Sequence, residues 1–318
     1  MYLRLSASAD RESVISSLVW LEMLAVIYSL FSAVAYGVSD FYGALASRKT
    51  SPLIASLVIH AVAGVAVGFS LIFVPGVWST AGMVAGIGCG VLESVGFVLF
   101  YISMTMGPVS ILAPIVAVIY AIVPVAWAVS RGETLSTLAW WGVLLGCISV
   151  IALSIGPKSG SASDEEIATA RKDGRSASPS LAAIGVGASA ALLWGFSTVF
   201  LDYAPADSGI TPAFAEMLAA VLTLIIVLLL MWRRIDKKVE PTTVSFILVA
   251  GVLFGAANSL LLLALISGSL ATVGMLVSLY PLATVLLARF VLREHISMIQ
   301  WTGIAGAIVA VALIGSGI

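Results

Sequence analysis

Long apolar runs follow one another along almost the whole chain, and this pattern limits the fold more than any other feature. A helix that crosses the hydrocarbon core of a bilayer needs about 20 predominantly apolar residues. Ten such runs can be separated at charged residues and at clusters of Pro, Gly and Ser. They cover residues 23–46, 52–74, 81–103, 108–129, 137–155, 182–203, 211–232, 244–266, 269–291 and 298–317. We therefore predict an all-α integral membrane protein with ten transmembrane helices, a multi-pass protein of the cell membrane.

The composition agrees with a lipid environment. Of 318 residues, 61% are hydrophobic and only 10% are charged, whereas soluble domains carry roughly 25% charged residues. The net charge of −1 offers no basic surface to nucleic acid, so we expect no such partner. Cys89 and Cys147 lie in apolar runs without the spacing of metal ligands, so we expect no disulfide framework, metal site or cofactor.

One polar segment divides the chain into two halves. Residues 156–180 are rich in Gly, Ser and charged residues, which is typical of a flexible aqueous linker. We expect no signal-peptide cleavage, because the apolar run from Val14 to Ala35 is longer than the core of a signal peptide. The predicted parts are an N-terminal tail (1–22), a first five-helix repeat (23–155), the linker (156–180) and a second five-helix repeat (181–318).

The two halves repeat the same pattern. Residues 133–142 (ETLSTLAWWG) and 294–303 (EHISMIQWTG) both read ExφSxxxWxG, where φ is apolar. Other matches occur at nearly the same offset. They are Tyr36-Gly37-Val38-Ser39 with Trp194-Gly195-Phe196-Ser197, Pro52 with Pro212, Gly90 with Gly251, and Gly107 with Gly268. A nearly constant offset across five helices indicates an internal duplication.

Each copy has an odd number of helices, so the second copy should enter the membrane inverted relative to the first. A 5+5 inverted repeat is an architecture of secondary transporters, whose substrate site lies between the copies near the membrane midplane. Glu133 and Glu294 should then lie at opposite membrane faces. Each begins the turn into the next helix, where a carboxylate suits the helix dipole.

These features resemble a known family. The paired Tyr-Gly and Trp-Gly of the first helices, the proline-containing fourth helices, and the GETLS and REHIS turns are similar to the EamA-like domains of the drug/metabolite transporter superfamily. The stretch SLYPLATVLLARFVLREHIS resembles the ninth helix and following turn of that group. The resemblance covers nearly all of residues 23–317. It implies a ten-helix carrier of small organic molecules, with a central cavity lined by helices 1, 3, 4, 6, 8 and 9.

Two arguments about membrane orientation disagree. Alternate loops carry twelve Lys and Arg on one side and three on the other, and positive charge favours the cytoplasm. This count places both termini outside, whereas members of the resembling family are usually drawn with both termini inside. The twelve are Arg48, Lys49, Lys158, Arg171, Lys172, Arg175, Arg233, Arg234, Lys237, Lys238, Arg289 and Arg293, and the three are Arg4, Arg11 and Arg131.

Of the carboxyl groups inside the predicted spans, two are candidates for a function. An ionisable side chain at the bilayer centre costs roughly 2.5–3.5 kcal/mol, so Glu93, near the middle of its span, indicates a function. Burial favours its protonated form, which makes it a candidate proton carrier; the alternative is a protonated Glu bonded to a neighbouring helix. Asp40 lies on a polar stripe one turn after Tyr36. It is a second candidate, unless it pairs with Arg48 or Lys49.

Other polar and aromatic residues extend the candidate site. Asn258 is expected either to bind substrate or to join helices. Tyr36, Tyr120, Trp194 and Tyr280 could clamp an apolar or cationic substrate, or serve packing alone. We expect structural or interfacial roles for two further residues in more peripheral helices, Glu216 and His60.

Prolines and glycines should shape the bundle. Pro114 and Pro124 in the fourth helix and Pro281 in the ninth predict broken or kinked helices beside a transport cavity. The GxxxG pairs permit close contacts, either within the chain or in a homodimer.

We therefore predict a secondary transporter that moves a small organic solute, a metabolite or drug-like compound, by alternating access. Proton coupling would run through Glu93, with Asp40. An uncoupled facilitator or exchanger is the alternative. The two His, at 60 and 295, and the absence of HExxH, GxSxG and P-loop motifs argue against an enzyme. A receptor role would leave the buried Glu93 without a purpose.

Overall fold

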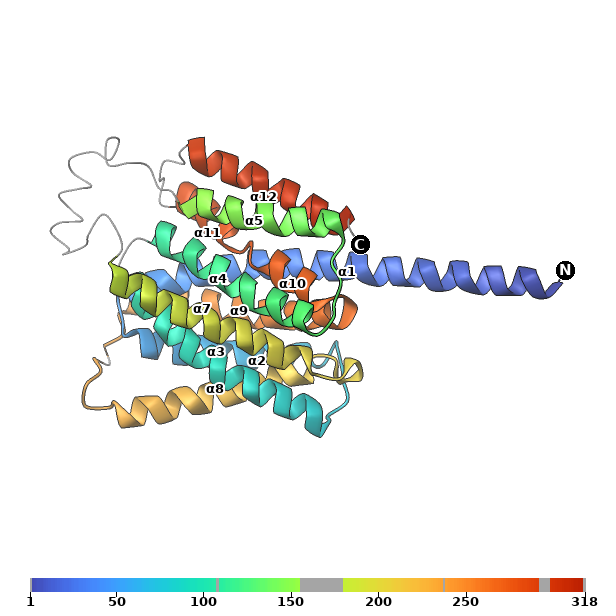
Figure 1. The fold of residues 1–318 in the computed structure, drawn as a ribbon. Helices are drawn as coiled ribbons and strands as arrows, with labels where there is room; N and C mark the ends of the chain where they lie inside the picture. Colours follow the sequence, from blue (N-terminus) through green and yellow to red (C-terminus); the bar gives the residue numbers. More distant parts are fainter. Residues whose placement is uncertain (1, 107–108, 155–179, 237, 292–297, 317–318) are drawn as a thin grey trace.

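The computed structural model describes residues 2–106, 109–154, 180–236, 238–291 and 298–316, and these form one bundle of helices (Figure 1). Almost all of the predicted linker lies outside the described residues. The elements are α1 (Tyr2–Ser47), α2 (Pro52–Ser70), α3 (Thr80–Met106), α4 (Val109–Ser130), α5 (Thr137–Ser154), α7 (Leu181–Asp202), the 3-10 helix η1 (Ala206–Ser208), α8 (Thr211–Leu230), α9 (Pro241–Ser267), α10 (Leu270–Val277), α11 (Pro281–Val291) and α12 (Met298–Ser316).

Six helices are long and apolar enough to cross a bilayer. They are Trp20–Ser47 of α1, and the whole of α2, α3, α7, α8 and α9. Shorter apolar helical stretches coincide with the other four predicted spans, at Ile115–Ser130, Thr137–Ser149, Leu270–Thr284 and Trp301–Ala310. The prediction of an α-helical, multi-pass membrane protein is thereby confirmed.

Side chains are distributed as a lipid solvent requires. Large apolar residues such as Phe31, Val65 and Leu229 are more than half exposed on the outside of the bundle. Many small and polar residues, and the carboxyl groups of Asp40, Glu93 and Glu216, are buried inside instead. Because lipid is as apolar as leucine, helices in a membrane associate through close packing and hydrogen bonds rather than through burial of apolar surface.

Local sequence explains where several helices begin. Pro52, Pro212 and Pro241 each stand in the first turn of a helix, where a missing N–H leaves no bond unmade. In the repeated ExφSxxxWxG motif, the Ser136 hydroxyl accepts a hydrogen bond of 3.1 Å from the Ala139 N–H. This serine, rather than Glu133, therefore caps α5. The second copy of that turn lies outside the described residues.

Helices from the two halves of the chain pack against each other. α1 packs on α9, and α3 packs on α7 and α8; α2 also packs on α9, α4 on α7, and α5 on α12. Ser32 and Ser39 of α1 donate hydrogen bonds of 2.8 and 2.9 Å to carbonyl groups of α9. Ser103 of α3 likewise donates one of 2.9 Å to Ala183 of α7.

The glycine pairs serve contacts within the chain. A Cβ atom at Gly90 would meet the carbonyl oxygen of Glu216, so only glycine lets α3 approach α8 this closely. At the matching position of the second half, a Cβ on Gly251 would lie 2.6 Å from Val62 of α2. Of the two readings of these glycines, packing inside one chain therefore has direct support.

The two proline-containing helices differ. The ninth predicted span is broken, because α10 ends at Val277 and α11 begins at Pro281. In contrast, α4 is continuous through Pro124, so the expected break does not occur there, and a kink at this proline stays a prediction. A proline removes one backbone hydrogen bond, and here its ring packs on Gly274 of α10, where a Cβ would lie 2.6 Å from it. The side chain of Pro114 lies outside the described residues.

Candidate functional site

A cavity lined by residues from both halves of the chain lies in the interior of the bundle. It is formed by α1, α3, α4, α7, α9, the end of α10 and the break before α11, which match the helices that the resemblance implied. The lining residues are Tyr36, Asp40, Cys89, Glu93, Phe97, Tyr120, Trp194, Ser197, Thr198, Phe254, Asn258, Leu261, Val277 and Tyr280. All seven residues proposed from the sequence as substrate or proton site are among them, so the fold brings them together.

Hydrogen bonds hold several of these side chains in place. The Tyr36 hydroxyl donates to Asn258 Oδ1 at 2.7 Å, and Asn258 Nδ2 donates to the Phe254 carbonyl at 3.2 Å. Asn258 therefore joins α9 to α1, which supports its helix-joining role without excluding contact with a ligand. On the other side of the cavity, Tyr120 and Thr198 share a hydrogen bond of 3.1 Å.

An aromatic wall closes one side of the cavity. The ring of Phe97 lies 4.6 Å from that of Phe254 and 5.6 Å from that of Trp194, between centroids. Trp194 Nε1 donates to the Glu93 carbonyl at 3.2 Å, which ties α7 to α3. His60 lies behind this wall and does not line the cavity. Its Nδ1 lies 2.8 Å from the Ser56 carbonyl, and its ring contacts Phe97 and Phe254 edge-on.

Asp40 is buried, with 4% of its surface exposed, and it lines the cavity. Pairing with Arg48 or Lys49 was the alternative predicted from the sequence. Lys49 Nζ instead lies 3.9 Å from Glu240 Oε2 at the end of the bundle. Asp40 therefore presents a carboxyl group to the cavity, as the predicted polar stripe of α1 requires.

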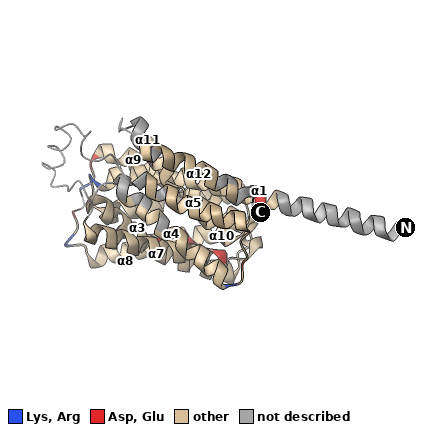
Figure 2. Cartoon of the chain, turned by 45° about the horizontal axis from the view of Figure 1, so that its top comes forward, with Lys and Arg blue, Asp and Glu red and all other residues tan. Residues whose placement is uncertain are grey.

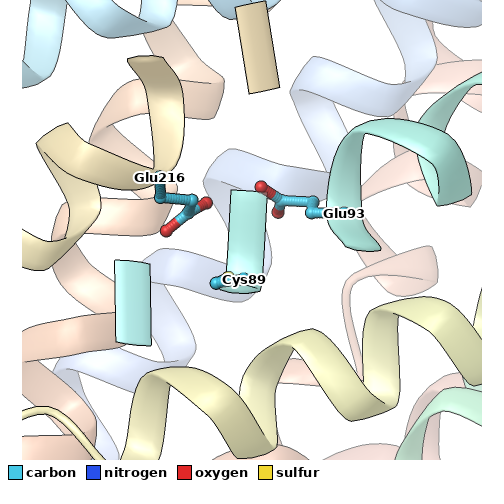
Figure 3. A group of neighbouring side chains, drawn as sticks. All are labelled: Cys89, Glu93 and Glu216. Atoms are coloured by element: carbon cyan, nitrogen blue, oxygen red, sulfur yellow. The ribbon is translucent and has the colours of Figure 1, made fainter. Parts of the chain in front are cut away.

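A second buried carboxyl group lies beside Glu93, and sequence reasoning did not connect the two. Glu216 of α8 and Glu93 of α3 point toward one another, with the thiol of Cys89 beside them (Figure 3). One oxygen from each carboxyl group and the sulfur atom all lie within 4.8 Å of one another. Glu216 is completely buried, and neither of its carboxyl oxygens has a hydrogen-bond partner among the described residues. A peripheral, interfacial position for Glu216 is therefore wrong.

The cluster contains acidic groups and no described basic group. Every Lys and Arg whose side chain is described is exposed, so no described cation faces the two carboxyl groups. Two full charges at that separation repel by roughly 3 kcal/mol at an effective dielectric constant of about 20. Groups of this kind can take up a positive charge, whether a proton or a metal ion. Uptake of a positive charge would relieve the repulsion.

The fold and the site define a class: an α-helical membrane protein with a central acidic and aromatic cavity between its two halves. Residues 181–316 match the model of the EamA-like transporter family. The second half of the chain is therefore similar to the EamA-like transporter family, in agreement with the resemblance found in the sequence. That family consists of transporters, so the match points to a membrane transporter.

A solved structure supports the fold along nearly the whole chain. A protein described only as "Crystal structure of protein" superposes with a TM-score of 0.64 and 16% identity, covering 94% of this chain and 96% of that chain. At this identity the similarity concerns the fold alone. No curated protein matches the sequence.

Proposed function

We propose that the protein is a secondary transporter that moves a small organic solute by alternating access, and that Glu93 couples this movement to protons. One observation carries the proposal. Residues from both sides of the linker line one buried cavity, and two of them, Asp40 and Glu93, are carboxylic acids inside the membrane. Ionisable groups in such positions usually belong to substrate paths or proton relays.

The packing of the helices supports an inverted repeat. If α1 to α5 correspond to α7, α8, α9, the α10–α11 pair and α12, then the most extensive contacts between the halves have counterparts. The packing of α1 on α9 corresponds to that of α7 on α3, and α2 on α9 corresponds to α8 on α3. Such a pair of modules could rock about the cavity and open it to one membrane face at a time.

The charges at the ends of the bundle favour one orientation. At one end, Thr50 Oγ1 donates to the Lys238 carbonyl at 2.8 Å, and Lys49 approaches Glu240. At another, Arg131 lies 5.8 Å above the ring of Tyr203. Figure 2 shows the described Lys and Arg residues at the ends of the bundle. We assign the end that carries Lys49 and Lys238 to the cytoplasm.

The residues that line the cavity also limit the chemical class of solute that it can bind. Six aromatic rings and two carboxyl groups face the cavity, with no Lys, Arg or His among the lining residues. Aromatic faces and carboxylates attract positive charge, so the lining favours a solute that has an apolar body and an amine or another cationic group.

Transport by the purified full-length protein in proteoliposomes tests the proposal. Amino acids, sugars and lipophilic cations would be offered with and without an imposed pH gradient. We expect gradient-driven flux of at least one cationic solute, and its loss in Glu93→Gln with folding and insertion intact. Glu133→Gln, the same change in the α4–α5 turn, is the matched control and should keep the flux.

Two results would count against the proposal. Gradient-driven flux that is unchanged in Glu93→Gln would remove the coupling role of this residue. Flux in the wild type that ignores the pH gradient would instead identify an uncoupled facilitator or exchanger.

A further inference from the structure

The contact between α3 and α8 places Glu216 beside Glu93. Gly86 and Gly90 face α8, and a Cβ atom on either would meet a backbone carbonyl oxygen, of Pro212 and Glu216 respectively. The two helices therefore touch at the level of their backbones. This contact fixes the backbone of Glu216 against the turn of α3 that carries Glu93, although 123 residues separate the two in the sequence.

Apart from each other, the carboxyl groups of Glu93 and Glu216 have no hydrogen-bond partner among the described residues for their buried oxygen atoms. Both oxygens of Glu216 and Oε2 of Glu93 are buried without a hydrogen-bond partner among the described residues. Buried polar atoms are rarely left in this state, because water has been removed and nothing replaces it. A proton on one carboxyl group would let its O–H donate a hydrogen bond to the other, and this would satisfy one oxygen of each group.

Among the described residues, none supplies a counter-charge to the pair. From α1, Tyr36 and Asp40 face the pair; Cys89 does so from α3 and Tyr120 from α4, and all of these are neutral or acidic. Among the described helical residues, α9 has no titratable side chain. On α2, the ring of His60 packs against Phe97 and Phe254; its Nδ1 lies 2.8 Å from the Ser56 carbonyl, and its Nε2 has no hydrogen-bond partner among the described residues.

A proton fits the cluster better than a metal ion. Zinc, the ion that accepts both sulfur and carboxylate ligands, takes four ligands in most proteins. Within 4.8 Å of one another the described residues offer three ligand atoms, and aromatic rings cover the cavity side.

We propose that Glu93 and Glu216 form one proton-binding site, with a single proton held between the two carboxyl groups. The pair, rather than Glu93 alone, would then deliver the coupling proton. This role of the pair in coupling rests on the proposed function. On release, the O–H bond of Glu93, which lines the cavity, breaks and its proton passes to water. The pair then carries two negative charges instead of one.

The location of the pair links its charge to the conformation of the protein. Glu93 and Glu216 belong to different halves of the chain and meet across the contact between α3 and α8. A doubly charged pair repels itself across that contact, whereas a singly protonated pair closes it with a hydrogen bond. Proton binding can therefore bias which arrangement of the two halves is populated.

Infrared spectroscopy of the full-length protein in lipid tests the shared proton without any knowledge of the solute. The C=O stretching band of protonated carboxyl groups would be followed from acidic to alkaline pH in the wild type, Glu93→Gln, Glu216→Gln and the double variant. We expect each single variant to lose the same band at mildly alkaline pH, and the double variant to lose nothing further. Glu133→Gln, the matched control, should leave the band unchanged.

Two independent bands, removed additively by the two single variants, would overturn the proposal. Stoichiometric retention of Zn²⁺ by the purified wild type, lost in Cys89→Ser, would overturn it as well. The wild-type titration alone also tests it, because absence of any protonated carboxyl band at neutral pH excludes a shared proton even if a variant fails to fold.

A transport measurement then separates this inference from the proposed function. If the wild type shows gradient-driven flux, Glu216→Gln should lose it as Glu93→Gln does. Full flux in Glu216→Gln would leave Glu93 as the coupling residue and overturn the role of the pair. If no solute is transported, the proposed function fails, while the infrared result still decides whether the proton is shared.

Discussion

Tyr36 and Asn258 lie 222 positions apart and are joined by a hydrogen bond of 2.7 Å from the tyrosine hydroxyl to the amide oxygen. The bond crosses between α1 and α9, which belong to different halves of the chain. Both residues also line the central cavity. The contact therefore couples the integrity of the interface between the halves to the geometry of the site.

Removal of this bond should weaken the protein. Tyr36→Phe leaves the buried oxygen of Asn258 without its donor, which costs about 1 kcal/mol in a membrane interior. We expect a lower melting temperature of the purified protein in detergent. Tyr42→Phe is the control, because no hydrogen bond of its hydroxyl group is found in the structure described. Equal destabilisation by both changes would show that loss of the hydroxyl itself, rather than of this bond, matters.

The close approach of α3 and α8 predicts that Gly90→Ala and Gly185→Ala have different effects on stability. Gly90→Ala places a methyl group against the Glu216 carbonyl oxygen and must push the helices apart. We expect a loss of about 1–3 kcal/mol in the free energy of unfolding, together with a shift of the shared carboxyl band.

Gly185→Ala provides the matched control for that change. Gly185 lies on the exposed face of α7, and no atom lies within 4 Å of the position that its Cβ would occupy. Alanine should be neutral there, or stabilising by up to about 1 kcal/mol through helix propensity. A Gly90→Ala protein as stable as Gly185→Ala would contradict the backbone contact.

Trp194 should influence transport through its indole N–H. The Nε1 group donates to the Glu93 carbonyl at 3.2 Å, and the ring lines the cavity. Trp194→Phe keeps an aromatic ring and removes the donor, so we expect KM for a transported solute to rise roughly fivefold, the equivalent of about 1 kcal/mol. Trp140→Phe, on the exposed side of α5, should leave KM unchanged. An unchanged KM in Trp194→Phe would reduce this residue to a packing role.

Periodicity and composition were sufficient for the class of fold. Apolar runs long enough to cross a bilayer indicate directly that lipid surrounds the chain. Six of these runs coincide with long apolar helices. The seven site residues could be grouped because polar, aromatic and ionisable side chains have few reasons to occupy membrane helices. Their arrangement around one cavity follows from helix packing.

The remaining features depend on contacts between distant segments. The proximity of Glu216 to Glu93 depends on how α3 and α8 are aligned lengthwise, which no pattern within either helix specifies. Pro124 and Pro281 look alike in the sequence, yet only the latter accompanies a break. The difference depends on what packs around each ring. At the start of α5, Ser136 caps the helix. The sequence had instead drawn attention to the carboxylate of Glu133 at that helix end.

The uneven distribution of charge predicts the orientation of the protein, and labelling of single cysteines can test it. Arg131 and Arg233 are both exposed, and in the proposed repeat they lie at opposite ends of the bundle. If positive charge keeps the end with Lys49 and Lys238 in the cytoplasm, Arg131→Cys should react with a membrane-impermeant maleimide in intact cells. Arg233→Cys should react only after the cells are opened. The native Cys89 is buried, and a Cys147→Ser background removes the other thiol.

The opposite orientation, and an arrangement without an inverted repeat, would each give a different labelling pattern in the same experiment. Reversed labelling would mean that both termini lie inside, as the family is usually drawn; a phosphatase fused after Ile318 would then be silent, and a fluorescent protein there would glow. Labelling of both cysteines from the same side is incompatible with either orientation of the inverted repeat. It would place the α4–α5 turn and the segment after α8 at one membrane face, and the cavity between the halves could then not open alternately to the two sides.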